Sequence, residues 1–189
     1  MPRNRRPVDR AEKRSEIVEA ATTLFTGDGY EHTSMGRIAK AAGVTTNTIY
    51  WYFRDKDELL VGVLDDIHDE ALSRFMALES SRLQERVLWV VDELEKYHRL
   101  VETVHARTSM SPCIDKWHNS FHDRWEGWIG AELRGAGTSE ADTEPMTRMI
   151  VFVIESMLTH PQDDVAKRAI VDLMFRTVDA PSQSRPSPT

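Results

Sequence analysis

Apolar side chains recur at three- and four-residue intervals along almost the whole chain of 189 residues, and this spacing constrains the fold most. Such a period is typical of one face of an α-helix, and no Val-, Ile- or Thr-rich run with strict alternation indicates a strand. The sequence therefore predicts an all-α protein. A chain of this length can bury a stable core without help from disulfide bonds or bound metal ions. Its one cysteine excludes an internal disulfide framework.

Glycines, prolines and capping residues divide the pattern into eight helical segments. The first three predicted helices are 9–26, a short one capped by Ser34 that ends at Gly43, and one capped by Thr45 or Thr46 that runs to Tyr52. The later ones begin at 56 or 57, 83, 114, 142 or 143, and 163, and they end at 78, 107, 133, 160 and 178. We expect four parts: a basic flexible arm over 1–8, a first helical domain over 9–56, a larger helical domain over 57–179, and a disordered tail over 180–189.

The net charge of −7 conceals an uneven distribution. Residues 1–56 carry ten Lys and Arg against seven Asp and Glu, whereas residues 57–189 carry fourteen against twenty-four. This asymmetry suits a nucleic-acid-facing module on an acidic body, although ordinary scatter explains a balance of +3 equally well. The basic arm has Arg3, Arg5 and Arg6, and it either lies along DNA or forms a solvated tail.

Residues 34–53 predict two short helices that meet at a sharp turn. Ala39 is small where the second helix crosses, and Gly43 sits where a positive φ is cheap for glycine alone. Ile38, Val44 and Ile49 are spaced to hold the crossing from inside. This is the spacing of a helix-turn-helix, whose second helix enters the major groove of DNA.

The segment from Ile17 to Leu60 also resembles the N-terminal domain of the TetR family of bacterial transcriptional repressors. The resemblance rests on Ile17-x2-Ala20-Ala-x2-Leu24-Phe25, Gly29-Tyr30, Ile38-Ala39-x2-Ala42-Gly43-Val44, Tyr50-x-Tyr52-Phe53 and Lys56-x-Glu58-Leu59-Leu60. It implies about nine helices, with a three-helix helix-turn-helix DNA-binding domain over 9–56 followed by a larger helical ligand-binding and dimerisation domain over 57–179. It further implies a homodimer on a palindromic operator, released by a small molecule.

Carried over by position, the resemblance gives a set of DNA-facing residues. Asn47 can pair with an adenine, and Tyr50, Tyr52 and Lys56 suit phosphates. Many family members have glycine at the position of Asn47, so the base preference does not transfer. Trp51 either packs or faces the DNA backbone. The full set is Thr33, Ser34, Arg37, Thr45, Thr46, Asn47, Thr48, Tyr50, Trp51, Tyr52 and Lys56.

Two apolar stripes near the end of the chain predict a dimer interface, which the resemblance places on the corresponding helices. About half of these residues can equally close the protomer's own core. The interface set is Met146, Met149, Ile150, Val153, Met157, Ala166, Ile170 and Met174.

An aromatic stripe on the 114–133 segment predicts the wall of a pocket for an apolar or aromatic effector. A well-filled core is the alternative. The pocket set is Trp89, Tyr97, Val101, Met110, Trp117, Phe121, Trp125 and Trp128.

Cys113, His118 and His122 are candidate metal ligands, because two histidines four residues apart on a helix can share one ion, and His98 and His105 are further candidates for the same ion. This gives the alternative function, a metal-sensing regulator or metal-dependent enzyme. No catalytic motif stands out, so we expect a regulator that is not an enzyme, with no cofactor. The longest nearly apolar run, Met149 to Leu158, is interrupted by Glu155 and is too short to span a bilayer. We therefore expect a cytoplasmic protein with no membrane partner.

Overall fold

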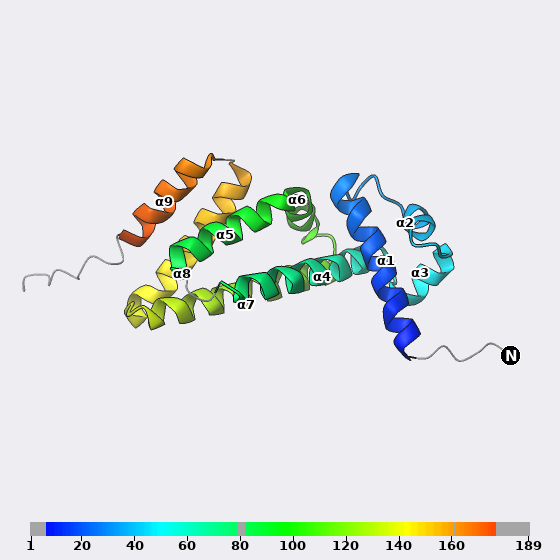
Figure 1. The fold of residues 1–189 in the computed structure, drawn as a ribbon, viewed down its shortest axis with the longest axis horizontal. Helices are drawn as coiled ribbons and strands as arrows, with labels where there is room; N and C mark the ends of the chain where they lie inside the picture. The colour runs from blue at the N-terminus through cyan, green and yellow to red at the C-terminus, as the bar shows by residue number, and fades with distance from the viewer. Residues whose placement is uncertain (1–6, 79–81, 161, 177–189) are drawn as a thin grey trace, which may run out of the picture. The chain divides into compact units, whose positions relative to one another are not determined.

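The computed structural model describes residues 7–78, 82–160 and 162–176, and within these ranges the chain is entirely helical, as predicted (Figure 1). Residues 1–6 of the predicted arm over 1–8 and the predicted tail over 180–189 lie outside the described residues, whereas residues 7 and 8 are already part of the first helix. The helices are α1 (Pro7–Gly27), α2 (Met35–Ala41), α3 (Thr46–Tyr52), α4 (Lys56–Met76), α5 (Leu83–Lys96), α6 (His98–Arg107), α7 (Pro112–Gly135), α8 (Glu140–Thr159) and α9 (Asp164–Arg176).

The predicted helix over 83–107 is two helices, and this correction brings the predicted segments to nine in the described part of the chain. The break falls at Tyr97, whose φ of −114° and ψ of 23° leave the helical region. Apolar residues continue at helical spacing through the break, so their period does not reveal it. The two halves serve different cores, since Val87 and Val91 pack in one cluster and Leu100 and Val104 in another.

The start of α8 also differs from the prediction. Ser139 caps this helix by accepting a hydrogen bond from the Asp142 amide at 3.2 Å. Pro145 therefore lies inside the helix and not near its first position. Because proline is best tolerated in the first turn of a helix, the sequence predicts a start at residue 142 or 143. The helix begins at Glu140, two or three residues earlier.

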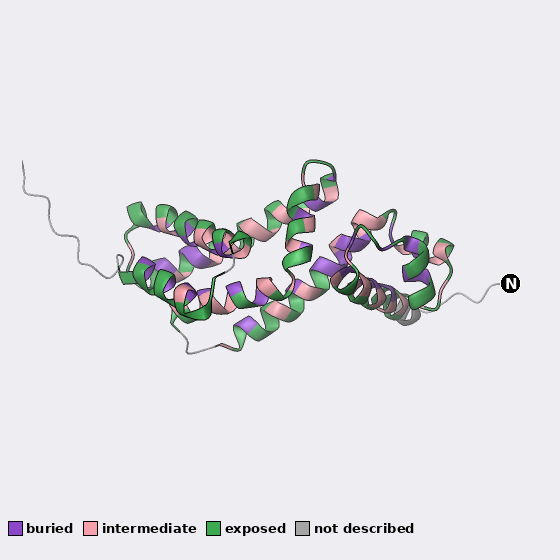
Figure 2. Ribbon diagram, turned by 90° about the horizontal axis from the view of Figure 1, so that it is seen from above, coloured by how far each residue is buried: buried purple, intermediate pink, exposed green. Residues whose placement is uncertain are grey.

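The chain divides into two compact units. The first comprises residues 1–76 and 97–122, and in it α1 packs against α2, α4 and α6. Its core joins the helix-turn-helix to later helices through fully buried side chains, among them Ile17, Phe25, Ile49 and Leu60. Figure 2 shows buried positions recurring along one side of the helices, with exposed positions opposite.

The second unit comprises residues 77–96 and 123–189, and in it α5 packs against α8 and α9. Lys167 of α9 is 5% exposed, and its ammonium group lies 2.6 Å from Glu95 and 3.5 Å from Asp92. The hydrogen bond to Glu95 raises the pKa of Lys167 despite burial, which acts in the opposite direction. A buried charge is thus paired where α9 meets α5.

None of the helices in the described ranges is long and apolar enough to cross a membrane.

Gly62 marks a close approach inside the first unit. A Cβ atom added there would lie 3.0 Å from the Phe53 ring and 3.2 Å from the Arg14 guanidinium. At Gly127 on α7 an added Cβ would meet nothing within 4 Å. The two positions therefore make a matched pair, both inside helices.

We expect Gly62→Ala to lower the free energy of unfolding by about 0.5–2 kcal/mol, because overpacking the Phe53 ring outweighs the gain in helix propensity. Gly127→Ala should raise it by about 0.5–1 kcal/mol, because the propensity gain stands alone. Urea denaturation followed by circular dichroism measures both values. Equal stabilisation by the two substitutions would contradict the close approach at Gly62.

Candidate nucleic-acid interface

The helix-turn-helix is formed by α2, α3 and the turn between them. Ser34 caps α2 by accepting from the Arg37 amide, and Thr45 caps α3 by accepting from the Thr48 amide, each at 3.2 Å. Gly43 has a φ of +64°, as the turn chemistry predicts. The Val44 amide donates to the Ala39 carbonyl at 2.9 Å, which closes the turn over the small alanine.

Helix α3 presents an outer face of polar and aromatic side chains. Only Ile49 of this helix is fully buried, whereas Asn47 is exposed and Tyr50 and Trp51 are 51% and 67% exposed. Thr46 and Tyr52 are half-buried. The Thr48 hydroxyl lies 2.9 Å from that of Thr45, so these two threonines support the start of the helix.

Trp51 lies between α3 and α1. The Arg10 guanidinium lies over its ring, 4.6 Å from the centroid, and the Tyr52 ring meets it edge-on at 5.7 Å. A cation over an indole face is a favourable contact that also holds the positive charge at the surface. The exposed Trp51 ring therefore positions the side chain of Arg10, a basic residue of α1.

Thr33, Arg37 and Lys56 differ from the rest of the predicted DNA-facing set. Thr33 is 1% exposed, and its hydroxyl donates to the Gly29 carbonyl at 2.9 Å, so its side chain supports the loop instead of facing solvent. Arg37 is exposed but donates to Asp28 at 2.5 Å and to the His32 carbonyl at 3.0 Å.

The Lys56 ammonium group is turned toward the loop before α2. It donates to the carbonyls of Tyr30 and Thr33 at 2.9 and 3.1 Å and lies 3.9 Å from the centroid of the Tyr30 ring. Burial lowers the pKa of Lys56. This lysine fixes the spacing between α4 and the helix-turn-helix, a role that its position in the sequence did not reveal.

Asp57 joins the first turn of α4 to α6. Arg107 donates to its two carboxylate oxygens at 2.8 and 2.9 Å, and the Tyr30 hydroxyl donates to the same group. Burial alone would raise the pKa of Asp57, but hydrogen bonds from Arg107, Tyr30 and Ser111 lower it overall. The role of Arg107 cannot be recognised from its neighbours in the sequence, because its partner is fifty positions away in the chain.

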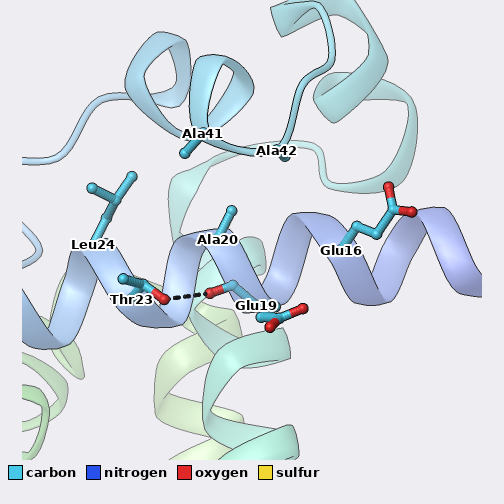
Figure 3. A pocket seen from close by; sticks show the side chains of 7 residues that line it. All are labelled: Glu16, Glu19, Ala20, Thr23, Leu24, Ala41 and Ala42. Atoms are coloured by element: carbon cyan, nitrogen blue, oxygen red, sulfur yellow. Dashed lines mark hydrogen bonds between the residues drawn. The ribbon is translucent and has the colours of Figure 1, made fainter.

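An open groove of about 440 Å³ lies between α1 and the end of α2 (Figure 3). Its floor is made of small or apolar side chains, among them Ala20, Leu24 and Ala41, and Glu16 and Glu19 stand at its rim. Carboxylates repel phosphates, so this side of the unit does not suit a DNA backbone. The outer face of α3 suits it better.

The predicted pocket residues fall in both units. In the first unit Trp117 and Phe121 stack with centroids 5.3 Å apart, and the Trp117 indole donates to Asp65 at 2.9 Å. Tyr97 packs partly buried against the core, Val101 is half-buried, and Met110 is 64% exposed. In the second unit Trp89 is half-buried, and Trp125 and Trp128 meet edge-on at 6.0 Å. None of these side chains lines the groove beside Ala20, and an effector pocket stays a prediction.

The predicted interface residues divide into buried and exposed groups. Ile150, Met157 and Met174 belong to the core of the second unit, and Met146, Val153 and Ala166 are partly buried. Met149 and Ile170 are 36% and 39% exposed. The most exposed large apolar side chains of α8 and α9 are Phe152, Val165 and Leu173.

Comparison with known proteins agrees with this geometry. Residues 17–63 match the family model described as bacterial regulatory proteins, tetR family. The HTH-type transcriptional regulator AcrR of Shigella flexneri is 52% identical over 48 residues, which are 25% of this chain and 22% of AcrR. The chain thus spans less than a quarter of this relative's length in the match.

Solved structures share the fold over most of the chain. A TetR transcription regulator from Haloarcula marismortui superposes with a TM-score of 0.71 at 18% identity, covering 90% of this chain and 98% of that one. A transcriptional regulator from Saccharomonospora viridis in complex with choline also gives 0.71, at 22% identity and with coverage of 88% and 96%.

Arg107→Ala should lower the free energy of unfolding by about 2–4 kcal/mol, because it leaves the Asp57 carboxylate partly buried without its cation. Arg148→Ala is the matched control, since its pair with Glu144 on α8 is mostly exposed, and it should change stability by less than about 0.5 kcal/mol. Urea denaturation at neutral pH measures both. A small and equal loss in the two variants would show that the Asp57 pair contributes no more than a surface pair.

Proposed function

We propose that the chain is a DNA-binding transcriptional repressor, from the premise that its residues 17–63 match the tetR family of bacterial regulatory proteins. The observation that carries the proposal is the exposed outer face of α3, with Asn47, Tyr50 and Trp51, on a helix-turn-helix closed by Gly43. A short helix of this kind fits the major groove of DNA. The relatives are transcriptional regulators, so we propose a regulatory and not an enzymatic role.

We divide the face by chemistry. Asn47 is placed to read base edges, with Thr46 and Thr48 beside it, while Tyr50 and the Arg10 side chain over Trp51 are placed to contact phosphates. Lys56 and Thr33 support this face indirectly, by holding the loop before α2 and helix α4 in position. A cationic contact of this sort makes affinity depend on salt, whereas a base contact makes it depend on sequence.

We propose that the protein binds a palindromic operator as a homodimer. Five large apolar side chains of α8 and α9 are exposed in the second unit: Met149, Phe152, Val165, Ile170 and Leu173. We propose that these side chains form one surface that a second copy of the same surface covers, because monomeric proteins rarely leave a contiguous apolar patch in water. Two helix-turn-helix domains in one dimer would also compensate for the modest positive charge of each domain.

We propose that a small apolar or aromatic effector releases the DNA. The half-buried aromatic side chains of α7 support this, and a protein of the same fold is known with choline bound. Within the first unit, Arg107 ties α6 to Asp57 at the start of α4. A shift of α6 would therefore reach the helix-turn-helix through α4. The effector needs only to bind better to the protomer geometry that misplaces α3.

Selection of binding sites from random DNA, followed by fluorescence anisotropy, tests DNA binding. Affinity should fall steeply with salt. Asn47→Ala should reduce discrimination at one base pair by about 1–3 kcal/mol, because a bidentate amide contact is lost. Tyr50→Phe should weaken selected and scrambled sites alike, because it removes a phosphate contact. Selection that enriches no sequence, or unchanged preference in Asn47→Ala, would contradict the proposal or the role of Asn47 respectively.

Phe152→Glu combined with Leu173→Glu should convert the dimer to a monomer and weaken operator binding, because two charges would be buried against their copies. Sedimentation velocity measures the state directly. Met76→Glu is the control, since Met76 is 58% exposed and lies on α4 in the other unit. A dimer that survives the double substitution would place the interface elsewhere.

A further inference from the structure

Three histidines from two helices of the first unit lie together. They are His105 in the last turn of α6 and His118 and His122 on α7. The Nε2 atoms of His118 and His122 are 3.2 Å apart, and one ring nitrogen from each of the three histidines lies within 4.8 Å of the others. In the described part of the chain, no other group of three His, Cys, Asp or Glu side chains is this close.

The backbone around these histidines is held in place. His105 follows the buried Val104, and His118 is one turn after Ile114, which is fully buried in the same core. Between the helices, the Met110 and Ser111 amides both donate to the Arg107 carbonyl, at 3.0 and 2.9 Å. The Asp115 amide then donates to the Ser111 carbonyl at 2.9 Å, which starts α7 at a fixed angle. The cluster is therefore a property of the packed corner and not of one loose side chain.

We propose that His105, His118 and His122 bind one divalent late first-row transition-metal ion, of the class of Zn²⁺, Co²⁺ and Ni²⁺. Imidazole nitrogen suits these ions, whereas Mg²⁺ and Ca²⁺ prefer oxygen. Tetrahedral ligation with Zn–N bonds of about 2.0–2.1 Å separates ligand nitrogens by about 3.3 Å. The His118–His122 separation already matches this value, and a small rotation of His105 completes three ligands. The fourth position is open to water or to a small anionic ligand.

The structure selects His105 over Cys113 as the third ligand. The Cys113 sulfur lies 3.3 Å from the Ser111 hydroxyl, and its side chain packs against the core of the first unit. A pair of histidines four residues apart occurs on many helices that bind no metal. The third histidine, contributed by a different helix, is what distinguishes this group. The site stands independently of DNA binding, because it concerns only the ion and these three side chains.

Cobalt titration of the full chain, freed of metal by a chelator, tests the site. We expect saturable binding of one Co²⁺ per chain, with the visible absorption of a tetrahedral centre, and displacement of Co²⁺ by Zn²⁺. Zn²⁺ should also raise the melting temperature, because the ion binds only the folded form. No saturable one-to-one binding would overturn the proposal.

His105→Ala is the decisive variant, because its side chain is exposed and its loss should not prevent folding. We expect it to weaken Co²⁺ binding by at least the roughly 10- to 100-fold that loss of an outer-shell partner costs. His160→Ala is the matched control, since His160 is exposed in the second unit, and Cys113→Ser should also bind as the native chain does. Circular dichroism checks that each variant is folded. Native affinity in His105→Ala would reduce the site to a surface histidine pair and overturn the proposal.

Discussion

The bidentate pair between Arg107 and Asp57 is the interaction on which the first unit depends. Asp57 lies in the first turn of α4, directly after Lys56, which donates to the loop before α2. Tyr30, on that loop, donates its hydroxyl to the Asp57 carboxylate. Both cations lie over the Tyr30 ring, with the Lys56 Nζ 3.9 Å and the Arg107 Cζ 4.9 Å from its centroid. The helix-turn-helix, α4 and α6 therefore meet at one partly buried cluster of charges, and none can shift without disturbing a paired ion.

This cluster responds to pH in a defined direction. The folded-state pKa of Asp57 lies below its ordinary value because of the hydrogen bonds from Arg107 and Tyr30, so its ionisation stabilises the fold at any pH above the pKa of the unfolded chain. That contribution disappears as the pH falls through the folded pKa. Burial raises the pKa of Tyr30, helped by its hydrogen bond to Asp57, and the phenol thus stays a donor. The Arg107–Asp57 ion pair and the hydrogen bond from Tyr30 are consequently both formed at neutral pH.

Local chemistry was enough to predict the helix-turn-helix, whereas long-range pairing was not. Gly43 and Ser34 act on residues within five positions, so the turn and the cap of α2 followed from spacing, whereas spacing left Thr45 and Thr46 open as the cap of α3 and the structure selects Thr45. Arg107 with Asp57, and Lys167 with Glu95, join residues 50 and 72 positions apart, and no period in the sequence records such pairs. The break at Tyr97 was hidden for the same reason, because the periodicity persists while the core it faces changes.

The candidate metal ligands show how far a motif can be trusted. Spacing alone identified His118 and His122, since four residues make one helical turn, and it offered Cys113 as a neighbour in sequence. It also offered His98 and His105 on the preceding segment, and packing selects His105, because α6 returns to α7 through a turn closed at Ser111, while the Cys113 side chain packs against the core. A helix period can pair residues on one helix, but the third ligand of a site depends on how two helices meet. An ion held by residues of both α6 and α7 would oppose the separation of these two helices. Metal binding is therefore physically linked to the position of α6, the helix that carries Arg107.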